Sequence, residues 1–117
     1  GGDLSQGRTA AATEFAHQSG AVVVLKGPGT VVAGPDGRCR VNTTGNCGMA
    51  KGGSGDVLSG VVLALLGLGM DALDACCCAV WLHGRAGDLA AQEKGQWGMT
   101  PTDLLERLPQ ALREVTE

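Results

Sequence analysis

The sequence predicts an α/β fold, in which helices pack on a small sheet. Three observations predict it: short valine-rich runs of strand length, glycine- and proline-rich turns between them, and longer segments with helical spacing on either side. Continuously apolar strands are typical of a sheet that is covered on both faces. The chain has 117 residues, the length of one ordinary domain, and its hydrophobic share of 44% is usual for a globular protein.

The first part of the chain is predicted to form one helix and three strands. Residues 8–18 carry apolar side chains at helical spacing. Residues 21–25 form a continuous apolar run, and residues 30–33 form a second short one. Residues 38–42 alternate between polar and apolar types, and the turn signal at residues 34–37 precedes them. We therefore expect the third strand to be half exposed and to pair back on the second.

The later part is predicted to be helical after a long polar loop at residues 43–55. Residues 56–68 are apolar nearly all round, which predicts a buried helix. Residues 71–92 form another helix or a pair of helices. Three strands offer these helices few places to pack. We therefore expect residues 1–117 to be a single partial domain, the C-terminal portion of a larger α/β domain.

The last helix has a clear predicted start. Thr100 can cap it, Pro101 suits its first position, and Asp103 completes a pattern that resembles a capping box. We expect it to run to about Val115 and to be kinked or split at Pro109.

Charge and hydropathy exclude two classes of partner. The net charge is −3 and no basic run occurs, which argues against a nucleic-acid partner. The longest apolar run, at residues 61–66, is far shorter than the roughly 20 residues that a membrane span needs. Residues 1–19 lack the apolar segment of a secretory signal peptide. We therefore expect no membrane association.

The cysteines indicate a reducing compartment. The chain has five of them, and Cys76, Cys77 and Cys78 are consecutive. Neighbours on a helix point about 100° apart, so this triplet suits neither a metal cage nor a disulfide framework. We predict reduced thiols that pack as small apolar side chains in a cytoplasmic protein.

A glycine cluster at residues 52–56, GGSGD, directly precedes the apolar helix. Glycines let backbone N–H groups converge, and a helix N-terminus adds unpaired donors and the positive end of its dipole. This combination predicts an anion site suited to phosphate. Asp56 is placed to act as a general base, although a plain helix cap is the alternative. The Walker A pattern is absent, since Lys51 precedes the glycines.

The surrounding sequence is more specific. The run NTTGNCGMAKGGSGDVLSG at residues 42–60 closely resembles the signature of the ADP/ATP-dependent NAD(P)H-hydrate dehydratases, which belong to the ribokinase-like superfamily. LKGPGT at residues 25–30 resembles the lysine–glycine nucleotide segment of that family. LHG at residues 82–84 with AGD at residues 86–88 is similar to its helix after the anion loop, and residues 99–112 to its terminal helix.

The resemblance implies a three-layer α/β/α fold and a set of site residues. One segment is expected to contact the nucleotide: Lys26, Gly27, Pro28, Gly29 and Thr30. A second is expected to wrap its phosphates: Asn46, Cys47, Gly48, Met49, Ala50, Lys51, Gly52, Gly53, Ser54 and Gly55. Asp56 is expected to contact the hydrated nicotinamide substrate and to act as the catalytic carboxylate.

The activity that the resemblance implies is the repair of hydrated NADH or NADPH (NADHX or NADPHX), with ADP or ATP as co-substrate. The ring hydroxyl would attack the terminal phosphate, and the phosphate ester would then be eliminated, because phosphate leaves far more readily than hydroxide. Mg²⁺ is expected to neutralise charge during the transfer. The family tends to form homo-oligomers.

The chain departs from the family pattern in places. Position 47 is Cys where Pro is frequent, and position 51 is Lys where Thr is frequent. Lys51 is equally well interpreted as a phosphate ligand or as a solvated loop residue, and Cys47 as tolerated variation or as a redox-sensitive thiol. His83 is expected to pack in its helix. The histidine-bearing substrate loop of the family has no counterpart here, so the chain is expected to hold the nucleotide half of the site.

Two other functions fit the same residues. One is a vitamin or sugar kinase of the ribokinase-like superfamily, which would release a stable phosphorylated alcohol. The other is a non-catalytic nucleotide-binding fragment or subunit that needs a partner chain.

Overall fold

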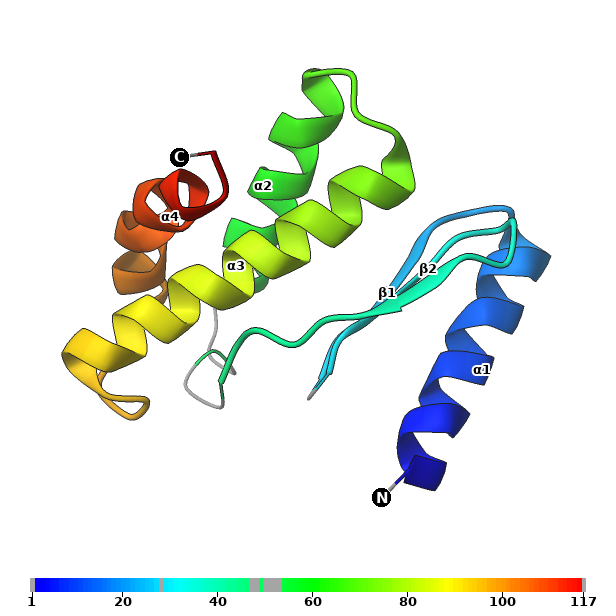
Figure 1. Cartoon of the computed structure of the whole chain (residues 1–117), viewed down its shortest axis with the longest axis horizontal. Coiled ribbons are helices and arrows are strands. Elements are labelled where there is room, and N and C mark those ends of the chain that lie inside the picture. Colours follow the sequence, from blue (N-terminus) through cyan, green and yellow to red (C-terminus); the bar gives the residue numbers. More distant parts are fainter. Residues whose placement is uncertain (1, 28, 47–48, 50–53, 117) are drawn as a thin grey trace.

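The computed structural model describes residues 2–27, 29–46, 49 and 54–116. Within them, one helix is followed by three short strands and then by three more helices (Figure 1). The elements are α1 (Gly2–Ser19), β1 (Val23–Leu25), β2 (Val31–Ala33), β3 (Cys39–Val41), α2 (Ser54–Gly67), α3 (Ala72–Lys94) and α4 (Pro101–Thr116).

The three strands form an antiparallel sheet in the order β1-β2-β3. Val32 in the middle of β2 is opposite Val24 on one side and Arg40 on the other. Helix α1 covers one face of the sheet, and α2 and α3 lie beyond the other face, with α4 against α3 (Figure 1). The prediction of an α/β fold is confirmed, and so is the pairing of the third strand with the second.

Alternation along β2 explains why both faces of the sheet are covered. Val31 and Ala33 point toward α1, where they meet Ala12 and Ala16, and all four side chains are buried. Val32 points the other way and joins the apolar cluster formed with α2 and α3. Small alanines on α1 let the helix approach the sheet closely, so that a sheet of only three strands has a packed layer on each side.

A further core lies between α3 and α4. Leu82, Leu89 and Leu104 are buried in it, and Met99 closes it from the connection between the two helices. At the surface, Arg85 donates two hydrogen bonds to Glu114, at 2.6 and 3.0 Å. The second half of α3 is therefore held firmly by α4.

The predicted starts of α3 and α4 are confirmed. Asp71 is the N-cap of α3 and accepts a hydrogen bond from the Asp74 N–H at 3.5 Å. At the start of α4, Thr100 Oγ1 accepts from the Asp103 N–H at 3.2 Å, and Asp103 Oδ2 accepts from the Thr100 N–H at 2.9 Å. This is the reciprocal pair of a capping box. Helix α3 is one helix, and α4 continues through Pro109 without splitting.

The prediction that α2 is a buried helix is wrong for this chain. Leu58 is buried, but Leu63 is 72% exposed and Leu68, which follows the helix, is 80% exposed. The reason is geometric: α2 packs mainly on α3 and has some contact with α4, and its opposite face has no covering element among the described residues. Helix α1 is also longer than predicted, because it begins at Gly2.

The cysteine triplet is spread around α3, as its spacing predicted. Cys76 is buried, Cys77 is half-buried and Cys78 is exposed. Burial raises the pKa of the Cys76 thiol, which favours the neutral, unreactive form. In the described part of the chain, no group of three or more His, Cys, Asp or Glu side chains is placed to hold a metal ion.

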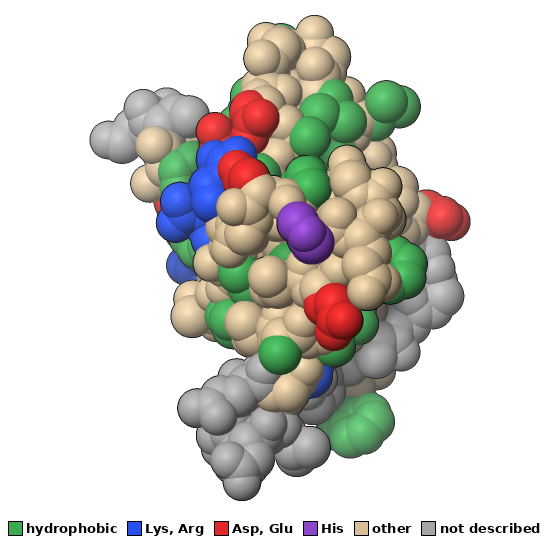
Figure 2. All heavy atoms as spheres, turned by 90° about the vertical axis from the view of Figure 1, so that its right-hand side faces the viewer, with side chains coloured by type: hydrophobic (Ala, Val, Ile, Leu, Met, Phe, Trp, Pro, Cys, Tyr) green, Lys and Arg blue, Asp and Glu red, His purple; other side chains and the backbone are tan. Residues whose placement is uncertain are grey.

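Charged side chains of both signs lie next to one another on the face of the molecule shown in Figure 2. Arg38, beside β3, pairs with Asp36 at 2.7 Å and with Asp71 at 3.7 Å. Over the residues that the structure describes, no helix combines the length and the apolar character needed to cross a bilayer.

Candidate functional site

The turn between β1 and β2 carries the first predicted site segment. Gly27 and Gly29 have positive φ angles, 145° and 64°, which favour glycine. Thr30 Oγ1 donates a hydrogen bond to the Gly27 carbonyl at 3.2 Å. The chain thus turns tightly directly after Lys26, at the end of β1.

This turn is held from outside by Arg8 of α1. Its guanidinium donates to the carbonyl oxygens of Leu25 at 3.2 Å, Lys26 at 3.1 Å and Gly29 at 3.4 Å. A Cβ on Gly27 would lie 2.8 Å from Arg8 Nη2, so the side chain lies tight against the turn. Arg8 was missed by the sequence analysis, because a single arginine in a helix forms no motif.

The stretch of loop that precedes the second segment lies along α3. Thr44 Oγ1 donates to the Trp81 carbonyl at 3.0 Å, and Asn42 Nδ2 donates to the Val80 carbonyl at 3.4 Å. Asn42 Nδ2 also donates to Thr44 Oγ1 at 3.0 Å. These side chains attach the loop to the backbone of the helix.

Two glycines on α3 allow this close approach. A Cβ on Gly84 would lie 2.1 Å from Thr44 Oγ1, and one on Gly87 would lie 2.4 Å from Met49 Sδ. Both distances are far below van der Waals contact. A Cβ on Gly84 would also lie 2.8 Å from the Thr44 carbonyl carbon, so only glycine fits there, whereas at Gly87 the neighbour is the flexible side chain of Met49. The LHG and AGD motifs of the sequence therefore have a structural meaning: they form the surface on which the loop lies.

Asp88 completes the attachment. Its Oδ2 accepts a hydrogen bond from the Gly45 N–H at 3.0 Å, and its Oδ1 accepts one from Asn46 Nδ2, also at 3.0 Å. Asp88 was part of a recognised motif in the sequence, but no role in the site was predicted for it.

The start of α2 meets the first segment. Ser54 is the first residue of the helix, and Asp56 is an exposed acidic residue in its first turn. A Cβ on Gly55 would lie 2.8 Å from Lys26 Nζ, so the ammonium group lies directly over this turn. The positive charge of Lys26 therefore adds to the positive end of the α2 dipole. The structure thus brings together Lys26 and Gly55, the residue before Asp56, from two distant parts of the sequence.

The remaining predicted positions lie outside the described residues. They are Pro28, Cys47, Gly48, Ala50, Lys51, Gly52 and Gly53. The two interpretations of Lys51 and of Cys47 therefore stay open.

Comparison with known proteins gives the family. A sequence model of the NAD(P)H-hydrate dehydratase family (Carb_kinase) matches residues 2–110. The chain belongs to the NAD(P)H-hydrate dehydratase family. The bifunctional NAD(P)H-hydrate repair enzyme Nnr of Thermofilum pendens is 50% identical over 98% of this chain. The ADP-dependent (S)-NAD(P)H-hydrate dehydratase of Bacillus subtilis is 41% identical over 92% of it.

The fold agrees with that of a solved member of this dehydratase family. The ADP/ATP-dependent NAD(P)H-hydrate dehydratase of Bacillus subtilis, co-crystallised with ATP/Mg²⁺, superposes with a TM-score of 0.88 at 40% identity over 95% of this chain. The chain spans less than half of these relatives: 40% of the solved chain, 39% of the Bacillus subtilis sequence and 22% of the Thermofilum pendens enzyme.

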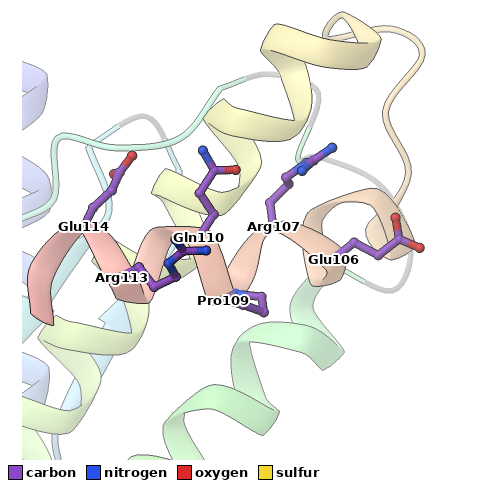
Figure 3. A pocket seen from close by; sticks show the side chains of 6 residues that line it. All are labelled: Glu106, Arg107, Pro109, Gln110, Arg113 and Glu114. Carbon is purple, nitrogen blue, oxygen red and sulfur yellow. The ribbon is translucent and has the colours of Figure 1, made fainter. Parts of the chain in front are cut away.

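A surface hollow elsewhere on this dehydratase-family chain is unrelated to the predicted site. All six side chains that line it project from α4: Glu106, Arg107, Pro109, Gln110, Arg113 and Glu114 (Figure 3). Arg107 pairs with Glu93 and Glu114 pairs with Arg85, so these charges serve the packing of α4 on α3. His83, buried in α3, is likewise a helix residue, as predicted.

Proposed function

We propose that this chain supplies the nucleotide side of an active site that converts hydrated NADH or NADPH back to NADH or NADPH, with ADP or ATP as co-substrate. The observation that carries the proposal is the position of Lys26, whose ammonium group lies against Gly55 in the first turn of α2, the turn that also carries Asp56. Membership of the dehydratase family supports it, as do the names of the relatives.

The nucleotide would bind between the two segments. Helix α2 offers the N–H groups of its first turn, and Lys26 offers a cation at the same place. Phosphates are bound well by this pairing of oriented donors with a positive charge. Gly27, Gly29 and Thr30 would contact the nucleotide from the turn, and the segment from Asn46 to Gly55 would surround its phosphates.

Asp56 would act as the catalytic carboxylate. It would take the proton of the ring hydroxyl as the hydroxyl oxygen bonds to the terminal phosphorus and the phosphorus–oxygen bond to the rest of the nucleotide breaks. The phosphate would then leave with the electrons of the carbon–oxygen bond, while a proton leaves the neighbouring ring atom and the double bond is restored. Asp56 is exposed in the structure, as a group that must meet a substrate has to be.

A magnesium ion fits this arrangement as a companion of the nucleotide. In the part of the chain that is described, no cage of three protein ligands exists, and Mg²⁺ commonly binds through substrate phosphates, water and one or two carboxylates. When bound, the ion would neutralise charge on the phosphates.

Three further proposals concern the whole protein. Residues 1–117 would be one partial domain, with the remainder of the domain supplying the substrate side of the site. The free thiols of Cys39, Cys76, Cys77 and Cys78 support a cytoplasmic location. We also expect the complete protein to form a homo-oligomer.

The test uses the complete open reading frame that contains this sequence. Recovery of the absorbance of reduced nicotinamide is followed from hydrated NADH with ADP or ATP and Mg²⁺, for the unchanged protein and for Asp56→Asn. Because one base contributes about 10²–10⁴-fold to such a step, the variant should lose at least about a hundredfold in kcat.

The matched control is Asp74→Asn, the same chemical change at an exposed residue in the first turn of α3. It should leave the rate unchanged. A folded protein that binds nucleotide but never restores the absorbance would refute the proposal, and a stable phosphorylated alcohol among the products would then indicate a small-molecule kinase.

A further inference from the structure

We propose that Asp88 is the positioning residue of the phosphate-binding loop, and this inference rests on the function proposed above. Asp88 reaches the site only through the loop: one carboxylate oxygen accepts from the Gly45 N–H and the other from Asn46 Nδ2, each at 3.0 Å. Asn46 is the first residue of the segment expected to surround the phosphates. The carboxylate therefore sets where that segment begins.

The chemistry of the contact requires a carboxylate. Both partners are donors, and an ionised carboxylate is the side chain of this size that accepts at both of its ends. An asparagine amide in its place would turn its NH₂ group, a donor, toward either the Gly45 N–H or the Asn46 amide nitrogen, which are also donors. A charged acceptor also makes the two hydrogen bonds stronger than neutral ones. Asp88 moreover determines the direction of the Asn46 amide, because only its nitrogen can face a carboxylate.

The helix surface beside Asp88 explains how so short a side chain reaches the loop. Gly84 and Asp88 are four residues apart and share one face of α3. A Cβ on Gly84 would collide with Thr44, and one on Gly87 with Met49, so the loop lies directly on the helix on either side of the carboxylate.

A purely electrostatic role in the helix fits the contacts less well. The cation nearest in sequence, Arg85, is bound by Glu114 through two hydrogen bonds of 2.6 and 3.0 Å. The two hydrogen bonds of the Asp88 carboxylate instead go to the loop, across 43 and 42 residues of sequence. The hydrogen bond to Glu114 is the largest cause that raises the pKa of the Arg85 guanidinium and the charge of Asp88 is the smallest, so the hydrogen bonds of Asp88 act on the loop.

The experiment compares Asp88→Asn and Asp88→Glu with Asp74→Asn in the complete open reading frame. The Michaelis constant for ADP in the presence of Mg²⁺, kcat, the dissociation constant of ADP by calorimetry and the melting temperature are measured for each. Asn keeps the shape and loses one acceptor, whereas Glu keeps the charge and displaces it by one methylene group.

We expect both Asp88 variants to weaken ADP binding about tenfold, which corresponds to about 1.4 kcal/mol, with kcat and melting temperature nearly unchanged. Asp74→Asn should change none of the four quantities. Unchanged ADP affinity in both Asp88 variants would overturn the proposal, and so would a loss of affinity that only parallels a fall in melting temperature. If ADP binds to the unchanged protein and more weakly to both variants, but no dehydration occurs, the role of Asp88 stands and the proposed dehydratase function fails.

Discussion

The two segments of the candidate site are held in different ways. The turn after Lys26 is held by one long side chain, since Arg8 reaches across from α1 to three carbonyl oxygens at 3.1–3.4 Å. In the loop that carries Asn42–Asn46 and Met49, the described residues lie directly on α3, where Gly84 and Gly87 allow the close approach. A long arginine can adjust to a small displacement, but a loop in backbone contact with a helix cannot. Substitutions beneath the loop should therefore have larger effects than substitutions beside the turn.

The largest effect is expected for Gly84→Ala. The new Cβ would lie 2.1 Å from Thr44 Oγ1 and 2.8 Å from the Thr44 carbonyl carbon, so the loop backbone must move. Overpacking of this kind costs about 1–3 kcal/mol, and loss of the Thr44–Trp81 hydrogen bond adds about 1 kcal/mol. Urea denaturation should show this loss of stability, together with weaker ADP binding.

Gly60→Ala is the matched control for that substitution. Gly60 lies inside α2, and a Cβ there would have no neighbour within 4 Å. Alanine is the better helix former by about 1 kcal/mol, so this variant should be as stable as the unchanged protein or more stable. If both variants lose stability equally, the close packing of the loop on α3 is not the cause.

A smaller effect is expected for Arg8→Ala. The hydrogen bonds to the carbonyls of Lys26 and Gly29 are exposed, so water replaces the guanidinium at little cost in stability. The turn becomes less ordered, and the Michaelis constant for ADP should rise about threefold, which is about 0.6 kcal/mol. Arg40→Ala, at an exposed arginine of β3, should leave ADP binding unchanged. If Arg8→Ala weakened ADP binding as much as Gly84→Ala does, the two segments would not differ in how firmly they are held.

The smallest effect concerns pH. The hydrogen bond from Arg85 lowers the pKa of the Glu114 carboxyl below its usual value. A lowered pKa in the folded state means that the ion pair contributes stability above the pKa of the unfolded chain and loses it as the pH falls through the folded value. Acid titration of the melting temperature should therefore show a shallower fall in Glu114→Gln than in the unchanged protein. The loop that lies on α3 should keep its position in this variant, because the ion pair lies at the α3–α4 contact.

The parts of the fold that follow from local chemistry were predictable from the sequence. Thr100, Pro101 and Asp103 form the start of α4 as their types require, and the antiparallel pairing of the third strand follows from the turn before it. The resemblance pointed to the right family because its central motif is long and specific.

The contacts between distant residues were not predictable. Arg8 meets Lys26 across 18 residues, and Asp88 meets Asn46 across 42, and no periodic pattern encodes either contact. The prediction that α2 is buried was wrong for a related reason. Apolar residues such as Leu63 show that a surface can be buried, but not which element covers it.

The most direct test of the proposed function is the stoichiometry of a single assay. Inorganic phosphate released and reduced nicotinamide restored are measured together from hydrated NADH, with ADP or ATP and Mg²⁺, using the complete open reading frame. We predict one phosphate per restored nicotinamide, with both products lost in Asp56→Asn. Restoration of nicotinamide without nucleotide, or in Asp56→Asn at the unchanged rate, would contradict the proposed function.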